Sequence, residues 1–270
     1  MSVPRLYASK LSTYTITASA GEAAGFPVSN LKTYFPDQKW KTAALTDNQT
    51  LTIDFGSAVT ADALVLDQHN FLNDNNIIFE AATDSGFTTG VVQVSTDLIA
   101  DTPIASENND LGTGNTRSIY HFASMSKRYW RLKFQAGGAP GLTWELGQIF
   151  ICARMDMPYT YDFPYKKGNP SFVTAEAVAL DGRIRTSQAY GGRTLNEFKF
   201  SLINDAARTA WITFISTVRG KLFPFYFLDA DGSTMYYGHL DADYDPVSTE
   251  RYQLNTIETF RMKNQMADVT

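Results

Sequence analysis

The sequence predicts a mainly β chain, with two β-rich units and one packed helix. Short runs that alternate apolar and polar side chains recur along it, for example at residues 51–55 and 129–134. This alternation is the period of a strand with one buried face. Clusters of Gly, Asn, Asp and Ser separate the runs. Strands at this spacing favour antiparallel sandwiches over alternating strands and helices.

The first half supplies a series of strands. Residues 51–55 form one strand that Gly56 and Ser57 are expected to end, and residues 63–66 form a more fully buried one. Residues 101–118 have the composition of an exposed loop. Further strands are expected at residues 77–82, 91–94, 118–122 and 129–134.

Residues 154–170 are the expected linker. Pro158, Pro164 and Pro170 are spaced through a stretch rich in Tyr and Phe. Proline removes a sheet donor and biases the preceding residue toward an extended conformation. We therefore expect a β-sandwich at residues 1–153, this aromatic linker, and a second β domain at residues 171–270.

The second half is expected to be β-rich around one helix at about residues 205–219. Asn204 or Asp205 can cap its N-terminus, and Gly220 can end it. One helical stripe holds Ala207, Trp211, Phe214, Ile215 and Val218. Predicted strands cover residues 173–180, 183–190, 195–202, 224–229, 234–240 and 251–261, with hairpin turns at Asp181-Gly182 and Gly191-Gly192.

Composition excludes several classes of partner. The formal net charge is −5 with acids and bases mixed, so nucleic-acid readout is not expected. No apolar run is long enough to span a membrane, and the N-terminus lacks the apolar core of a signal peptide. Cys152 is the only cysteine, which excludes an intrachain disulfide framework. It lies in an apolar run, where we expect it to be buried.

The sequence shows no motif for catalysis. His69, His121 and His239 lack metal-ligand spacing. Nucleophile-elbow, phosphate-loop and dinucleotide motifs are also missing. Residues 229–233 resemble the start of a calcium loop but lack the later glutamate, so a hairpin turn explains them. We expect no enzyme activity, no catalytic residues, no cofactor and no metal site.

One tract is the most plausible recognition surface. Flat aromatic faces can stack on sugar rings or on partner side chains, while Asn and His supply hydrogen bonds. The competing interpretation is packing and turn formation, since tryptophans are often core residues. The candidate ligand-binding residues are Tyr34, Phe35, Trp40, His69, Asn70 and Phe71.

Dispersed segments of the first half, taken in order, resemble the discoidin-like (coagulation factor 5/8 C-type) β-sandwich. The resemblance implies a module that displays binding loops and does no chemistry, and that sometimes binds calcium. The segments are residues 30–32, 40–42, 51–56, 63–70, 128–134 and 145–151.

Residues 170–263 resemble the ring-forming domain of tailed-bacteriophage minor tail proteins, of the distal-tail or upper-baseplate type. Residues 193–200 lead into the helix, and residues 220–229, 238–240 and 252–260 follow it in the matching order. The resemblance implies a tail-tube-like β domain with a flanking helix, arranged as a ring of copies, a hexamer in this family.

Together the two resemblances imply a structural component of a virion tail tip, assembled in the host cytoplasm. The ring would join the tail tube to the hub or baseplate, and the sandwich would dock tail fibres or host surface glycans. Repeated interfaces sum modest contacts into a stable assembly. The alternative is a carbohydrate-binding or adhesion protein outside any virion. A hydrolase with a binding module would need an active site in residues 170–263, where none is apparent.

Overall fold

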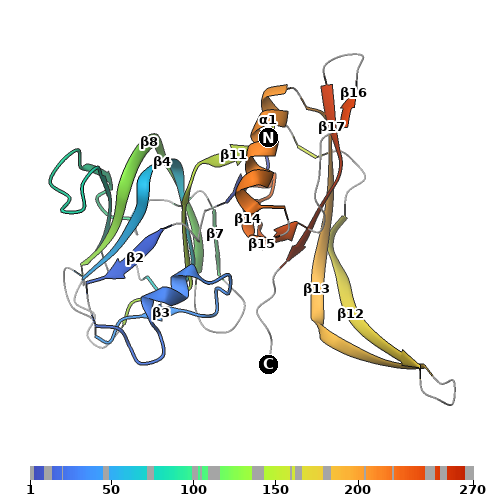
Figure 1. Cartoon of the computed structure of the whole chain (residues 1–270), viewed down its shortest axis with the longest axis horizontal. Coiled ribbons are helices and arrows are strands. Elements are labelled where there is room, and N and C mark those ends of the chain that lie inside the picture. The colour runs from blue at the N-terminus through green and yellow to red at the C-terminus, as the bar shows by residue number, and fades with distance from the viewer. Residues whose placement is uncertain are drawn as a thin grey trace.

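The computed structural model is mainly β, and its described part holds one α-helix. Figure 1 shows two β units side by side, with the helix in the second unit. The predicted fold class, mainly β with antiparallel sheets and one packed helix, is confirmed. The described residues are 3–8, 14–19, 21–44, 49–71, 76–98, 103, 105–108, 116–135, 143–158, 160–161, 166–178, 184–203, 205–220, 222–240, 247–249 and 254–264.

The first unit is an antiparallel β-sandwich built on two long strands, β4 (Gln49–His69) and β8 (Thr116–Gln135). The N-terminal half of β4 pairs with β2 (Thr15–Ala18) and with the C-terminal half of β8. That half of β8 also pairs with β5 (Asn76–Ala82), and β6 (Val92–Ser95) follows β5. The other halves carry β10 (Gln148–Cys152) and β7 (Ala105–Asn108) at their edges. The two long strands therefore have different neighbours along their length: β2 and β5 pair with one half of them, and β10 and β7 pair with the other half.

A bulge separates the two halves of β4, so that one strand has different neighbours before and after it. Asp54 pairs with Tyr129, but the next pair is Val59 with Lys127, so β4 carries extra residues here. Gly56 has φ +74°, which a residue without Cβ adopts at little cost. The prediction that Gly56 and Ser57 end a strand is wrong, because a glycine at positive φ suits a bulge as well as a turn.

The core of the sandwich is rich in aromatic rings. Trp40 lies in the short strand β3 (Trp40–Lys41), which pairs with β9 (Glu145–Leu146) beside the 3-10 helix η1 (Val28–Lys32). Its ring contacts Phe134, which also contacts Trp144. Trp130 stacks on Phe79 on a neighbouring strand. Buried aromatic pairs of this kind add to the stability gained from apolar burial.

The second unit is an eight-stranded antiparallel sheet. Its described order is β11 (Arg154–Asp156), β1 (Arg5–Tyr7), β14 (Phe225–Leu228), β15 (Met235–Leu240), β17 (Leu254–Asn264), β13 (Ile184–Ile203) and β12 (Lys166–Val178), with β16 (Val247–Thr249) also paired to β17. The helix α1 (Asp205–Val218) matches the predicted helix at about residues 205–219. It buries Trp211, Phe214 and Val218, and Phe214 meets Phe225 edge-on at 5.0 Å between ring centroids.

The strand β13 runs through Gly191-Gly192, where the sequence predicted a hairpin turn. Tyr190 pairs with Val173 and Arg193 pairs with Ser171, so the two glycines form an irregularity in a continuous strand. The hairpin prediction is wrong here, since Gly in a strand also marks bulges. The other predicted turn, at residues 181–182, lies outside the described residues.

The strand pairing connects the two units in a way that the sequence did not indicate. β1 pairs with β11 (Leu6 with Met155) and with β14 (Leu6 with Phe227), so both chain ends of the sandwich enter the second sheet. The expected bounds of 1–153, 154–170 and 171–270 stay a prediction, but β1 and β11 both belong to the second sheet. Of the expected linker, residues 159 and 162–165 lie outside the described residues.

Candidate functional site

Three of the candidate ligand-binding residues are buried in the sandwich. Trp40 is 1% exposed and His69 is 3% exposed. His69 stacks on Phe71 with 4.7 Å between ring centroids, and its Nε2 lies 3.1 Å from the Ser118 Oγ. Burial lowers the pKa of His69 to about 4, so this ring is neutral at pH 7. These contacts are packing contacts, and a ligand role for the three stays a prediction.

Asn70 makes turn contacts at the end of β4. Its Nδ2 donates to the carbonyl oxygen of Thr143 at 2.7 Å, and its Oδ1 accepts from the backbone N–H of Glu145 at 2.9 Å. Both groups of the amide are therefore used to hold the chain next to β9. This is the turn role that the competing interpretation assigned to Asn70.

Tyr34 lies at the boundary between the two units, and Phe35 follows it in the chain. The Tyr34 ring contacts Phe223 at 5.4 Å, and its carbonyl oxygen accepts a hydrogen bond from the Tyr237 hydroxyl at 3.1 Å. Phe35 is 51% exposed although its neighbours in the chain are held in place. The six candidates therefore do not share one surface, because three are core residues and Asn70 holds a turn, whereas Tyr34 contacts the second unit.

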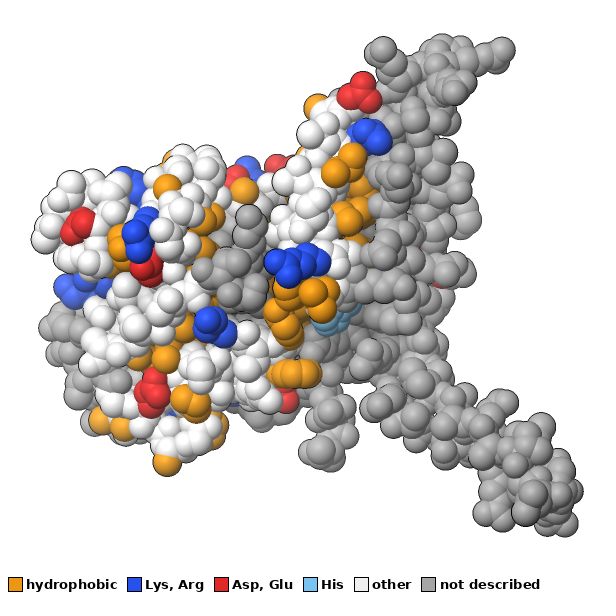
Figure 2. Space-filling model, in the orientation of Figure 1, with side chains coloured by type: hydrophobic (Ala, Val, Ile, Leu, Met, Phe, Trp, Pro, Cys, Tyr) orange, Lys and Arg blue, Asp and Glu red, His pale blue; other side chains and the backbone are white. Residues whose placement is uncertain are grey.

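Hydrophobic side chains gather on the surface near this boundary. Figure 2 shows such a group beside a basic side chain in the middle of the view. Leu222 is exposed next to Phe223, and the Arg219 guanidinium lies 5.3 Å from the centroid of the Phe223 ring. Arginine over an aromatic ring is favourable at a solvent-exposed site.

Behind this surface, a buried polar group joins the units. Asp67 is fully buried, and its Oδ2 accepts from the Arg117 Nη2 at 2.9 Å and from the Tyr226 hydroxyl at 2.7 Å. The Gln148 Oε1 lies 3.2 Å from that hydroxyl, and the Tyr226 ring meets Phe150 edge-on. We call Asp67, Arg117, Gln148 and Tyr226 the junction lock.

The junction lock suits a fixed orientation of the two units. Burial, and then the charge of Asp67, hold the pKa of Tyr226 well above its usual value, so the phenol stays a neutral donor. A buried charge pair adds little net stability, but removing one partner leaves the other charge uncompensated. Sequence reasoning missed this group. The available signals were Tyr226, inside the otherwise apolar strand β14, and Asp67, directly after the apolar run of residues 63–66.

A second hydrogen bond joins the units between β1 and β8. The Tyr7 hydroxyl of β1 lies 2.9 Å from the Nε2 of His121 in β8. Burial first, and then the charges of Arg154 and Arg5, lower the pKa of His121 to about 4. The ring is thus neutral at pH 7, and the contact is a neutral hydrogen bond.

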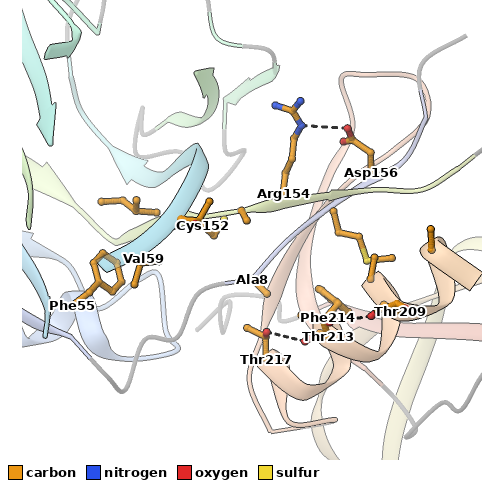
Figure 3. Close-up of a pocket in the computed structure, with 16 residues that line it drawn as sticks. Ala8, Phe55, Val59, Cys152, Arg154, Asp156, Thr209, Thr213, Phe214 and Thr217 are labelled. Carbon is orange, nitrogen blue, oxygen red and sulfur yellow. Dashed lines mark hydrogen bonds and ion pairs between the residues drawn. The ribbon is translucent and has the colours of Figure 1, made fainter. Parts of the chain in front are cut away.

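A cavity of about 620 Å³ opens between the units (Figure 3). Phe55 and Val59 of β4 and Cys152 of β10 form one wall. Helix α1 forms the facing wall with residues such as Thr213 and Phe214. β11 passes between these walls, as Figure 3 shows, with Arg154 and Asp156 at one rim.

Cys152 is the nucleophilic side chain among the described residues that line the cavity. Burial raises the pKa of the Cys152 thiol, which therefore stays protonated and a poor nucleophile. Across the described ranges, no three His, Cys, Asp or Glu side chains group as metal ligands.

In the same ranges, no helix is long and apolar enough to cross a membrane.

No protein-family model matches the sequence, and no curated protein matches it. A chitosan-binding module of a chitosanase/glucanase from Paenibacillus sp. IK-5 is similar in structure, with 22% identity, a TM-score of 0.39, and coverage of 52% of this chain and 94% of the module. The family 32 CBM of C. perfringens NanJ, solved with galactose, has 15% identity and a TM-score of 0.40, covering 56% and 99%.

A Ruminococcus gnavus fucosidase, solved with fucose, is also similar. It has 11% identity and a TM-score of 0.41, with 54% of this chain and 27% of the fucosidase covered. All three TM-scores are below 0.5. The similarity therefore supports no inference about what this chain binds or does.

Proposed function

We propose that this chain is a structural subunit of a tailed-bacteriophage tail tip, of the distal-tail or upper-baseplate type. Its second unit would join copies of itself in a ring, a hexamer in the family it resembles, between the tail tube and the hub. The sandwich would face outward and dock tail fibres or host glycans. The resemblance of residues 170–263 to ring-forming tail domains motivates this proposal.

The observation that supports assembly most directly is the long ribbon of β12 and β13. Residues 195–203 of β13 also pair with β17, but residues 184–193 pair only with β12 in the described part of the chain. Figure 1 shows this ribbon extending away from the rest of the molecule. A two-stranded ribbon is marginally stable alone in water, and its open edges can pair with another chain. A neighbouring subunit would supply that support.

The junction between the units also favours a structural role. The junction lock holds the sandwich at a set orientation, which a repeating assembly needs if every copy is to dock the same partner. Three candidate ligand-binding residues pack in the core and Asn70 holds a turn. These uses weigh against a sugar site built from them.

The test is the oligomeric state of the purified chain. Size-exclusion chromatography with light scattering should show a species of ring size whose share of the protein rises with concentration. Electron microscopy should show closed rings. A variant in which Asn-Gly replaces residues 174–189, so that Val173 and Tyr190 can still pair across a two-residue turn, should keep the rest of its sheet and remain a monomer. A wild-type chain that stays monomeric at every concentration, alone and with tail-tube protein, contradicts the proposal.

The second candidate function is a carbohydrate-binding or adhesion protein outside any virion. The observation in its favour is Phe35, which exposes half of its surface from a loop that is otherwise held in place. An exposed aromatic face can stack on a sugar ring. Glycan arrays with the wild type and Phe35→Ala distinguish the two. Tight glycan binding by a monomer, lost in Phe35→Ala, would favour this candidate over the ring subunit.

A further inference from the structure

We infer that the cavity between the two units is a binding site for an uncharged, mainly apolar small molecule. Its volume of about 620 Å³ falls within the roughly 300–1,000 Å³ typical of small-molecule sites. Boundaries between structural units are frequent places for such sites. The inference does not depend on whether the chain forms a ring.

The sandwich wall of the cavity is apolar. Phe55 and Val59 flank the bulge of β4, and Ile151 and Cys152 come from the neighbouring strand β10. Figure 3 shows Phe55 and Val59 on one side of the space and the labelled residues of α1 on the other. The Cys152 thiol is neutral because burial raises its pKa, so it adds no charge to this wall.

The helical wall is apolar in spite of its threonines. The hydroxyls of Thr209, Thr213 and Thr217 donate to the carbonyl oxygens of Asp205, Thr209 and Thr213 at 2.9 Å each. A hydroxyl that donates within its own helix has no donor left for a ligand, and only its oxygen can still accept. The wall therefore offers a ligand no hydroxyl donor from these three threonines, and Ala210 and the Phe214 ring add apolar surface.

The shape of the cavity favours an elongated ligand. Its lining residues on α1 run from Ala206 to Thr217. At about 1.5 Å per residue, that stretch of helix is roughly 16 Å long. A fused or linked pair of aromatic rings, or an aliphatic chain, fits this length better than a compact polar molecule.

The charges at the rim favour an uncharged ligand. The Arg154 Nε lies 3.3 Å from the Asp156 Oδ2, and the Arg154 Nη1 lies 3.8 Å from the Asp62 Oδ2. Arg5 also pairs with Asp156, at 3.2 Å. Two cations and two anions thus compensate one another. An ionic ligand would lose its hydration without gaining an unpaired partner at this rim.

The test uses two fluorescent probes that differ only by a charge. N-phenyl-1-naphthylamine is neutral, and 8-anilino-1-naphthalenesulfonate is the same ring system with a sulfonate. We expect saturable, one-to-one binding of the neutral probe and at least about tenfold weaker binding of the sulfonate, because burying its charge without a partner is unfavourable.

Two matched variants locate the site. Ala210→Phe places a ring in the cavity, whereas Ser216→Phe places the same ring on the same helix at an exposed position that does not line it. We expect Ala210→Phe to weaken binding of the neutral probe about tenfold or more, and Ser216→Phe to leave it unchanged. Circular dichroism would verify that both variants fold.

Failure of the wild type to bind the probe saturably overturns the inference. The inference is also overturned if Ala210→Phe binds the neutral probe as tightly as the wild type, or if the wild type binds both probes equally tightly. Ring formation is measured separately, so neither result decides the proposed function.

Discussion

The junction between the two units has a closed side and an open side. On the closed side, the buried Asp67 carboxylate accepts hydrogen bonds from Arg117 and Tyr226, and Tyr34 packs on Phe223. On the open side, the two units leave a cavity with apolar walls. Directional bonds between buried polar groups tolerate little change, whereas methyl-lined space can accept added atoms. The contact between the two units is thus fixed by hydrogen bonds at one edge, whereas at the other edge it leaves room for larger side chains or a ligand.

The largest expected effect breaks the closed side. Asp67→Ala removes the buried carboxylate that accepts from the Arg117 Nη2 and from the Tyr226 hydroxyl, and we expect a loss of about 3–5 kcal/mol in the free energy of unfolding. Urea denaturation measures it. The control is Asp54→Ala, which removes a more exposed ion pair with Arg128 and should cost much less, because solvent screens an exposed pair. Equal losses in both variants would show that the junction lock has no special role.

Acid should also weaken the closed side, through His69 in the strand that carries Asp67. Burial holds its pKa at about 4, against a usual value of 6.5. Between these pH values only the unfolded chain binds the proton, so the free energy of unfolding falls as the pH drops from 6.5 to 4. The loss at pH 4 is on the order of 3 kcal/mol.

Urea denaturation at pH 7 and pH 4.5 measures this effect. His121, whose pKa burial also lowers to about 4, acts in the same direction. The variant His69→Gln should therefore retain part of the pH dependence and lose the share that belongs to His69. A variant with the same pH dependence as the wild type would assign the effect to other groups.

A smaller effect comes from the close approach of two loops on the closed side. A Cβ on Gly147 would lie 2.0 Å from the Pro36 carbonyl oxygen and 2.7 Å from the Gln68 Cβ. We expect Gly147→Ala to cost about 1–3 kcal/mol by overpacking, measured as above. Gly21→Ala is the control, since its Cβ would come no closer than 3.8 Å to Ala43. A neutral Gly147→Ala would show that the loop of residues 33–38 moves freely.

The smallest effect is expected on the open side. Ala210→Phe adds a whole ring at the cavity, yet Ala210 is exposed and the space beside it is empty of protein atoms. We expect the free energy of unfolding to change by no more than roughly 0.5–1 kcal/mol, about the difference in helix propensity. A loss as large as that of Gly147→Ala would mean that the two sides do not differ.

Local signals in the sequence predicted the elements better than their connections. The stripe of Trp211, Phe214 and Val218 and the cap at its start predicted α1 within a residue at each end. Gly56 and the Gly191-Gly192 pair were interpreted as strand ends, and both lie within strands. Glycine suits tight turns and bulges alike, and only the pairing with the partner strand decides which of the two forms.

The candidate site could be predicted only in part, because its geometry depends on the second unit. The aromatic tract around Tyr34 and Trp40 was noticed, but nothing local separates a ring that packs from one that is exposed. Asp67 and Tyr226 are far apart in the sequence and meet only after both units fold. The cavity has no sequence motif, since its lining comes from β4, β10, β11 and α1, which meet only in the folded chain.

The position of β1 bears on how the chain is made. β1 is synthesised before the sandwich, but the strands it pairs with, β11 and β14, are synthesised after it: Leu6 pairs with Met155 and with Phe227. Long-range pairing of this kind slows folding. Expressing the second unit from residue 157 onward would remove β1 and β11 and expose the edge of β14, which favours aggregation. A fragment meant to isolate that unit needs β1 and β11 joined by a short turn in place of the sandwich.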